Sequence, residues 1–235
     1  MLGLLRPRTK RRAPPGALVV YTAIFGHIPD ELRPPGRVAP DPSVRYLCFT
    51  DRIDRSKRIG PWELGPPLWT HPDPRRMARY HKTLSHLVAP EAELTVWLDG
   101  NIQLRVDPWT LVERHLGDGL EVAAFKHRDR DCVYDELEAC LRLEKDGAER
   151  MTHQVARYRA QGYPPRHGLA ETGVLARRHS DRVREFNRSW WDEIEQGSVR
   201  DQLSFNFVLW RLGLDYDRFP GQSIRSPYVR YQRHR

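Results

Sequence analysis

The tripeptide Asp99-Gly100-Asn101 is the first place in the sequence where residue types and spacing point to chemistry. Asp99 follows the apolar run LTVWL, and Asn101 lies two residues further along. Residues two apart share one face of extended backbone, so this carboxylate and amide oxygen could bind one hard divalent cation. Gly100 would let a phosphate approach closely. An Asp-Gly pair is equally typical of a turn between two strands, and the motif alone leaves both interpretations open.

Carboxylates also occur in two later segments that could contact a substrate. Asp201 and Gln202 begin the segment DQLSFN, where the carboxylate also suits the N-cap position of a following helix. Glu171 lies in GLAETG beside a flexible glycine, where it could orient an acceptor hydroxyl, serve as a general base or cap a turn. Each segment therefore has a structural and a catalytic interpretation.

Cationic side chains provide groups that could hold phosphates. Arg79 and Lys82 are about one helical turn apart in the segment RYHK, although exposed helical cations are also common as solvated groups. His127 and Arg128 belong to FKHRDRDCVYDE, a mixture of charges that is also typical of a solvated loop. The sequence has no P-loop lysine motif, complete GxGxxG, HExxH, GxSxG or CxxC. Kinases, dinucleotide-dependent dehydrogenases, zinc proteases and serine hydrolases therefore lack their signatures.

Hydrophobic patterning predicts strands that alternate with helices along the whole chain. Apolar, β-branched runs closed by glycine or an acidic residue indicate strands, and apolar residues at helical spacing after an Asp N-cap indicate helices. This alternation predicts an α/β fold with a mainly parallel central sheet flanked by helices. The expected strands span 17–26, 45–51, 61–69, 93–104 (interrupted by the Asp-Gly-Asn turn), 121–127 and 170–179; the expected helices span 73–90, 107–116, 132–161 (two helices around Gly147), 180–197 and 200–213; the remainder is expected to be irregular.

The residues that end the expected strands are candidates for a site, because ligands of such sheets bind outside the carboxyl ends of the strands. Four of the five ends carry a titratable group, which is more than a purely structural sheet requires. These ends are Thr22 to Gly26, Asp51, Asp99 to Asn101, His127 and Glu171. We therefore expect a ligand site along this edge.

Length, composition and charge limit the classes of protein further. The 235 residues suit one large domain, and no run approaches the ~20 apolar residues that a membrane span needs. The formal net charge is +8, but most of the 39 basic residues are arginines spread along the chain, and no basic run alternates with aromatic residues. We therefore expect an anionic small molecule such as a nucleoside diphosphate as the partner, and no nucleic acid.

Both ends of the chain are basic. Residues 1–16 are expected to form a disordered tail, residues 17–220 the domain, and residues 221–235 a second basic tail. The first tail lacks the apolar stretch that follows the positive end of a signal peptide, and the three cysteines fit neither a metal site nor a disulfide framework. These features predict a cytoplasmic protein whose basic tails would make any contact with a membrane.

Five ordered motifs together resemble the nucleotide-sugar half of GT-A glycosyltransferases. They are YTAIFG, YLCFTD, ARYHK, VWLDGNI and the helix start DPW. WLDGNI together with KHRDRDCVYDE, GLAETGVLARRH and RDQLSFNFVLW is similar, more specifically, to a mucilage- and turgor-related glycosyltransferase-like family shared by bacteria and plants, long catalogued as a domain of unknown function. The resemblance covers about residues 17–220 and implies a GT-A-like single domain with a Rossmann-like nucleotide-sugar half.

The resemblance implies a role for each candidate residue. Asp99 and Asn101 would bind Mn²⁺ or Mg²⁺, where GT-A enzymes usually have two aspartates; His234 is the one histidine beyond residue 179, and we assign it no role. Asp201 and Gln202 are similar to the pair at the reaction centre of retaining GT-A enzymes. The donor would be held by Thr22, Ala23, Phe25, Gly26, Asp51, Arg79, Lys82, Asp99 and Gly100.

The expected activity is glycosyl transfer from a nucleoside-diphosphate sugar, with a uridine diphosphate sugar favoured, to a glycan or lipid-linked acceptor. Retention is favoured, with Glu171 orienting the acceptor hydroxyl; with inversion, Glu171 would be the general base. Acceptor contacts are assigned to His127, Arg128 and Thr172. The alternative is a non-catalytic nucleotide-sugar or glycan binding module on the same scaffold, which the asparagine at position 101 motivates.

Overall fold

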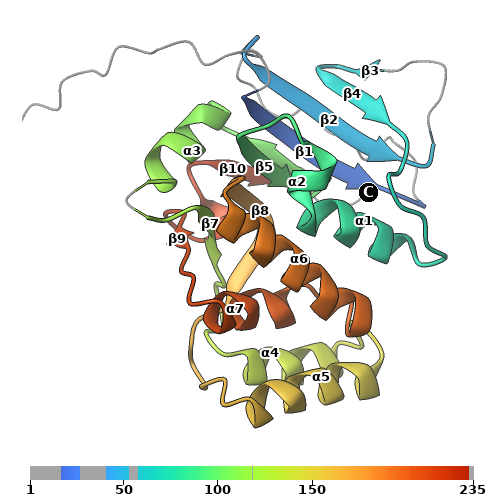
Figure 1. Ribbon diagram of the computed structural model, residues 1–235, viewed down its shortest axis with the longest axis vertical. Helices are drawn as coiled ribbons and strands as arrows, with labels where there is room; N and C mark the ends of the chain where they lie inside the picture. The colour runs from blue at the N-terminus through green and yellow to red at the C-terminus, as the bar shows by residue number, and fades with distance from the viewer. Residues whose placement is uncertain (1–16, 27–40, 53–57, 118, 233–235) are drawn as a thin grey trace, which may run out of the picture.

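A computed structural model describes residues 17–26, 41–52, 58–117 and 119–232. Within them, an eight-stranded sheet has the strand order β3-β4-β2-β1-β5-β8-β7-β9, and β10 pairs separately with β6 (Figure 1). The strands are β1 (Leu18–Ile24), β2 (Val44–Thr50), β3 (Arg58–Ile59), β4 (Trp62–Gly65), β5 (Leu94–Leu98), β6 (Ile102–Leu104), β7 (Val122–Lys126), β8 (Ala170–Arg178), β9 (Asp217–Arg218) and β10 (Val229–Tyr231). The helices are α1 (Pro74–Thr83), α2 (Ser85–Val88), α3 (Pro108–His115), α4 (Val133–Arg142), α5 (Ala148–Ala160), α6 (Asp181–Gln196), α7 (Gln202–Arg211) and the 3₁₀ helix η2 (Ser223–Arg225).

The α/β class with a central sheet flanked by helices is confirmed; β4, β2, β1 and β5 form its main parallel part, and β9 pairs parallel with β7 at one edge. β8 is the main departure, because it runs antiparallel to both β5 and β7. The chain leaves β7, forms α4 and α5, and returns to the same edge of the sheet, so β8 must run in the opposite direction. Glu171 therefore begins a strand instead of ending one, yet it still lies at the edge where β1, β2, β5 and β7 end.

The two faces of the sheet have separate hydrophobic cores. β1 is buried over its whole length, with Val19 and Tyr21 on one side and Leu18 and Val20 on the other. The first side packs against α1, α6 and α7, and the second packs against α3, β6 and β10. A strand buried on both faces needs a continuous apolar run, which LVVYTAI supplies.

The single helix expected over residues 73–90 is in fact two helices. α1 begins at the predicted N-cap Asp73, whose carboxylate accepts a backbone N–H of the first turn at 2.9 Å. The chain breaks at Leu84 (φ −90°, ψ 47°) before α2 begins. The buried guanidinium of Arg177 on β8 donates to the backbone carbonyls of the last two residues of α1, at 2.6 and 2.9 Å. The last two backbone carbonyls of α1 therefore accept hydrogen bonds from a residue far along the chain.

The segment after α7, expected to be irregular, contains regular structure. β9 pairs with β7, and β10 pairs antiparallel with β6, so that Tyr231 lies opposite Ile102. The part of the expected tail 221–235 that contains η2 and β10 is therefore folded. Strands of two or three residues carry no periodic signal, which is why the sequence pattern missed them. The expected tail 1–16 and His234 lie outside the described residues.

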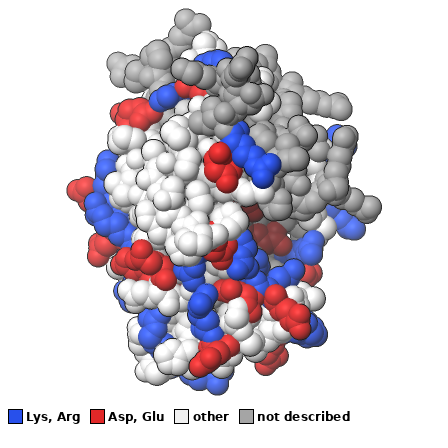
Figure 2. All heavy atoms as spheres, turned by 90° about the vertical axis from the view of Figure 1, so that its right-hand side faces the viewer, with Lys and Arg blue, Asp and Glu red and all other residues white. Residues whose placement is uncertain are grey.

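Charged side chains of both signs lie next to one another on the face that Figure 2 shows. Although the formal net charge is +8, the Lys and Arg side chains on that face are interspersed with Asp and Glu and do not form one separate basic surface. In the part of the chain that the structure describes, no helix is both long and apolar enough to cross a membrane.

Candidate active site

Two cavities lie at the edge where β1, β5 and β7 end and β8 begins. The β1 cavity has a volume of about 330 Å³ and the β8 cavity about 320 Å³, and they share Arg79 and Asp99. The β1 cavity is lined by Ala23, Ile24, Phe25, Pro74, Arg75, Ala78, Arg79, Trp97, Asp99, Gly100 and Asn101. The β8 cavity is lined by Arg79, Lys82, Asp99, His127, Arg128, Glu171, Thr172, Gly173, Arg200, Asp201, Gln202, Ser223, Ile224 and Tyr231.

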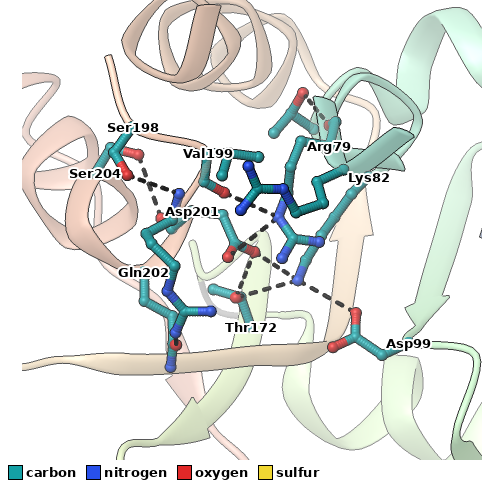
Figure 3. Close-up of polar contacts among 12 residues, drawn as sticks. Arg79, Lys82, Asp99, Thr172, Ser198, Val199, Asp201, Gln202 and Ser204 are labelled. Carbon is teal, nitrogen blue, oxygen red and sulfur yellow. Dashed lines mark hydrogen bonds and ion pairs between the residues drawn. The ribbon is translucent and has the colours of Figure 1, made fainter. Parts of the chain in front are cut away.

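Lys82 is the centre of the polar network in the wall between the cavities (Figure 3). Its side chain is 1% exposed, and its Nζ lies 2.6 Å from Asp201 Oδ2 and 3.3 Å from Asp99 Oδ1. Nζ also donates to Thr172 Oγ1 at 3.2 Å. Helix α1 supplies this lysine and, one turn earlier, Arg79, so the spacing recognised in the sequence places both cations on the same side of the helix.

Asp201 is a buried anion, and its carboxylate makes no capping hydrogen bond to α7. Besides Lys82, it accepts the Thr172 hydroxyl at 2.8 Å and lies 3.4 Å from Arg79 Nε. Burial alone would raise the pKa of Asp201, but the charges of Arg79, Lys82 and Arg200 hold it well below its usual value. Asp201 is therefore suited to holding the Lys82 ammonium in place, and its low pKa makes it a poor proton acceptor.

Asp99 faces both cavities and is 39% exposed. Its Oδ1 accepts the Trp97 indole N–H at 2.7 Å in addition to Lys82. A Cβ on Gly173 would stand 3.3 Å from Asp99 Oδ2 and 3.0 Å from the Tyr231 hydroxyl oxygen. The absence of a side chain at Gly173 therefore keeps the space beside Asp99 open.

The other two residues of the Asp-Gly-Asn motif line the β1 cavity. Asn101 Nδ2 donates to the backbone carbonyl of Gln232 at 3.4 Å, which ties the motif to the segment after β10. A Cβ at Gly100 would stand 2.9 Å from Ile24 Cδ1. A side chain at position 100 would therefore require the Ile24 side chain of β1 to shift.

The ends of β1 and β2 are joined by a hydrogen bond from backbone to side chain. The N–H of Gly26 donates to both oxygens of Asp51, at 3.2 and 3.1 Å. Of the expected donor residues on β1 and after it, Ala23 and Phe25 line the β1 cavity, but the Phe25 ring packs against His81 with centroids 5.0 Å apart. Thr22 is 1% exposed and lines neither cavity, because it lies within the sheet.

The expected acceptor residues line the β8 cavity, but two of them are fully engaged. The Thr172 hydroxyl is bound to Asp201 and Lys82. His127 is buried, and its Nδ1 accepts the backbone N–H groups of the two residues after Arg128 at 3.2 and 3.1 Å. Burial lowers the pKa of His127, which favours the neutral ring that these bonds require. Arg128 is the exposed member of the three.

Glu171 and Gln202 both line the β8 cavity, and hydrogen bonds hold their polar groups there. Glu171 accepts the backbone N–H of Arg128 at 3.5 Å and the hydroxyl of Ser223. Gln202 donates to the carbonyl of Ala170 at 3.2 Å and accepts Arg200 at 2.8 Å, which fixes its amide. The structure thus brings both residues into the β8 cavity with Asp201.

Several lining residues of the β8 cavity were missed by the sequence analysis: Gly173, Arg200, Ser223, Ile224 and Tyr231. Arg200 directly precedes Asp201, so its position in the motif was a usable signal. Tyr231 had no signal, because it lies on a three-residue strand in a segment expected to be irregular. Burial and the charge of Asp99 raise the pKa of Tyr231, so it remains a neutral phenol.

The arrangement offers few protein ligands for a divalent cation. The described residues contain no group of three or more His, Cys, Asp or Glu side chains that could hold a metal ion. Mg²⁺ nevertheless often takes one or two protein oxygens and completes its shell with phosphates and water. Asp99 is partly exposed, and Lys82 and Trp97 both contact its Oδ1, so its Oδ2 fits a cation of this kind. Asn101 lines the same cavity as Asp99.

Comparison with known proteins points to one family. A family model described as "TOD1/MUCI70, glycosyltransferase-like domain" matches residues 9–220. A probable hexosyltransferase MUCI70 of Arabidopsis thaliana is 27% identical over 217 residues, which cover 81% of this chain and 37% of that protein. The alkaline ceramidase TOD1 of the same plant is 29% identical over 137 residues, 54% of this chain and 30% of that protein. The chain thus spans about a third of the length of these curated relatives.

Two solved structures are similar to this chain at low sequence identity. The apo structure of the bifunctional glycosyltransferase WbbM has a TM-score of 0.50 and 11% identity, and the match covers 92% of this chain and 40% of that one. The apo form of mouse xyloside xylosyltransferase 1 has a TM-score of 0.45 and 10% identity, covering 83% and 81%. The first likeness supports the expected fold class.

Proposed function

Because the chain belongs to the TOD1/MUCI70 glycosyltransferase-like family, we propose that it transfers a hexose-like sugar from a nucleoside diphosphate to a hydroxyl of a glycan or lipid-linked acceptor. A uridine diphosphate sugar is the favoured donor. The observation that carries this proposal is the pair of cavities with Arg79 and Asp99 in their common wall. Two cavities with a common wall suit a reaction in which a nucleotide and an acceptor must meet at one carbon of the transferred sugar.

The β1 cavity suits the nucleotide part of the donor. Gly26 and Asp51, which contact each other, do not line this cavity but lie at the same ends of β1 and β2, where they would meet the base. Arg75 and Arg79 line the cavity, and Lys82 lies at the boundary with the β8 cavity. These cations would neutralise the negative charge that develops on the departing diphosphate, which is a large term when the groups are already in place.

A divalent cation, Mn²⁺ or Mg²⁺, is part of the proposal, with Asp99 and Asn101 as its protein ligands. When bound there with the diphosphate, it would add to the charge neutralisation that the cationic side chains provide. Asp99 has a second task in either case, because it holds Lys82 and Trp97 in place through Oδ1.

The β8 cavity suits the transferred sugar and the acceptor hydroxyl. Glu171 is partly exposed there and can orient that hydroxyl. Retention is our proposal for the stereochemical outcome, on the likeness of the Asp201-Gln202 pair to retaining glycosyltransferases. Gln202 would face the sugar, while Asp201 positions Lys82 and takes no proton. With inversion, Glu171 is the group that could act as the general base.

Thermal stabilisation by nucleoside diphosphates, with and without Mn²⁺, tests the donor site. A ligand at ~100 times its Kd adds about 2.7 kcal/mol to the free energy of unfolding, which raises Tm visibly. We expect uridine diphosphate to stabilise the protein, and Asp99→Ala to remove the Mn²⁺-dependent part. Glu91→Ala, in an exposed ion pair with Arg45, is the matched control. No stabilisation by any nucleoside diphosphate would contradict the proposal.

The second candidate is a non-catalytic module that binds nucleotide sugars or glycans, and the asparagine at position 101 favours it. The two candidates differ in turnover. Release of free nucleotide from a uridine diphosphate sugar, followed by the anomeric proton signal of the product, measures transfer and its stereochemistry together. If wild type and Asp99→Ala give the same background rate while both bind nucleotide, the binding module is the better description.

A further inference from the structure

A third cavity, which the proposed function leaves unused, lies beside the β8 cavity. This α7 cavity has a volume of about 780 Å³, more than twice that of either neighbour. It is lined by residues of the end of β7, the loop before β8, α7 and the segment after α7. The volume falls in the range of cavities that hold organic ligands, roughly 300–1,000 Å³.

The α7 and β8 cavities are separated by the start of β8. Two amides one helical turn apart on α7 hold Ala170 there: Gln202 donates to its carbonyl at 3.2 Å, and Asn206 accepts its N–H at 2.8 Å. Gln202 lines the β8 cavity and Asn206 lines the α7 cavity. The same division occurs at the end of β7, where Lys126 lines the α7 cavity and His127 the β8 cavity. The two cavities are therefore neighbours on either side of the start of β8.

The buried lining of the α7 cavity carries a hydroxyl without a protein partner. Tyr216 is 5% exposed, and its hydroxyl lacks a hydrogen-bond partner among the described residues. Asn206, also 5% exposed, uses its Oδ1 for the N–H of Ala170. Buried hydroxyls are nearly always satisfied in native proteins, so the Tyr216 hydroxyl points to a ligand that offers hydroxyls.

The remaining lining identifies the class of that ligand. The partly exposed indole of Trp210 offers an apolar face of the kind that packs against the C–H face of a sugar ring. The exposed charges carry both signs, so neither an anionic nor a cationic ligand is favoured over a neutral one. They are Lys126, Asp131, Arg166, Asp215 and Arg218.

We propose that the α7 cavity binds the second and further sugars of a neutral oligosaccharide acceptor, whose terminal hydroxyl enters the β8 cavity. This inference rests on the proposed glycosyl transfer and adds the acceptor class: an extended neutral glycan and not a single sugar. It also assigns a role to Trp210 and Tyr216, two residues outside the reaction centre.

Titration of the protein with neutral tetrasaccharides tests the proposal directly. The probes are cellotetraose, xylotetraose, mannotetraose and galactotetraose at millimolar concentration, and the readout is the indole ¹H–¹⁵N resonance of Trp210, assigned by its loss in Trp210→Leu. We expect at least one probe to shift this resonance. Absence of a shift with all four probes would overturn the proposal.

A matched pair of variants separates binding from folding. Tyr216→Phe removes the unpaired hydroxyl in the α7 cavity, and Tyr163→Phe removes an equally unpaired hydroxyl outside it. We expect Tyr216→Phe to weaken tetrasaccharide binding about fivefold, the order of one lost hydrogen bond, and Tyr163→Phe to leave it unchanged. Equal affinities in the two variants would overturn the assignment of the site.

The proposed function is measured separately, by the nucleotide-induced rise in Tm. If tetrasaccharides bind at Trp210 but no nucleoside diphosphate stabilises the protein, the cavity assignment holds and glycosyl transfer fails. If nucleotides bind while no tetrasaccharide moves the Trp210 resonance, the donor site holds and the assignment of the α7 cavity fails.

Discussion

The buried ion pair between Lys82 and Asp201 is the contact whose removal tests our description of the site most directly. The two side chains are 1% and 3% exposed, and Nζ lies 2.6 Å from Oδ2. Asp201→Asn keeps the shape of the side chain but leaves the ammonium of Lys82 without its nearest counter-charge. Loss of one partner of such a pair costs about 3–5 kcal/mol of unfolding free energy. Asp99 remains 3.3 Å from Nζ, but it is 39% exposed and water screens its charge.

Urea denaturation at pH 7 measures this cost as a free energy of unfolding. In thermal unfolding, we expect the same loss to lower Tm by roughly 10 °C for a chain of this length. The comparison also depends on pH. Neighbouring cations lower the pKa of Asp201 in the folded protein, so the stability that its charge contributes is complete above the unfolded pKa near ~4. It is lost as the pH falls below that value. The difference between wild type and Asp201→Asn should therefore begin to shrink near pH ~4 and continue to shrink as the pH falls further.

The control is an ion pair of similar length at the surface. Arg45 and Glu63 lie 3.0 Å apart but are 44% and 33% exposed, so Arg45→Gln should cost under about 1 kcal/mol. If Asp201→Asn costs no more than Arg45→Gln, the pair does not carry the charge compensation that we assign to it. The double variant Lys82→Met with Asp201→Leu removes both charges and should recover much of the lost stability.

Three further predictions concern the cavities and the acid side of the stability profile. Gly173→Ala would place a Cβ 3.0 Å from both the Tyr231 hydroxyl oxygen and the Cδ1 of the core residue Ile102, so we expect at least a tenfold loss of transfer in steady-state kinetics together with a fall in Tm; an unaltered rate would contradict this. Burial lowers the pKa of His81 from 6.5 to about 4, so the folded protein favours the neutral ring. The free energy of unfolding should therefore be highest above pH 6.5 and fall by up to about 1.4 kcal/mol per pH unit between pH 6.5 and about pH 4. A urea series in which the free energy of unfolding stays constant over that range would refute this prediction. Asp51→Ala releases the N–H of Gly26 and should weaken uridine diphosphate binding about tenfold by calorimetry, whereas an unchanged Kd would place the base elsewhere.

Local sequence signals determined much of the scaffold. The Asp-Pro pairs at residues 73–74 and 107–108 predicted two helix starts, and in both the carboxylate accepts a backbone N–H of the first turn. The apolar run LVVYTAI predicted a strand, and it is buried on both faces as β1. Gly197 ends α6 as expected. These features depend on neighbours within a few residues, so a single sequence contains them.

The residue types of the site were also visible in the sequence, but their roles were not. Asp201 had two interpretations, as a helix cap or as a group near the substrate. Its carboxylate makes no capping bond and instead meets Lys82 and Thr172, which come from α1 and β8. Thr172 was expected to contact an acceptor, yet its hydroxyl is engaged with the same two groups.

Only the tertiary structure decided which distant segments close the cavities. The direction of β8 follows from the return of the chain to the edge it left, and this direction brings Glu171 to the ends of the parallel strands. The pairing of β10 with β6 brings Tyr231 toward Gly173 and Asp99. Such contacts join residues many tens of positions apart, and their free energy depends on packing across the whole fold. No local pattern of residue types encodes that dependence, whereas caps, turns and periodicity are encoded within a few residues.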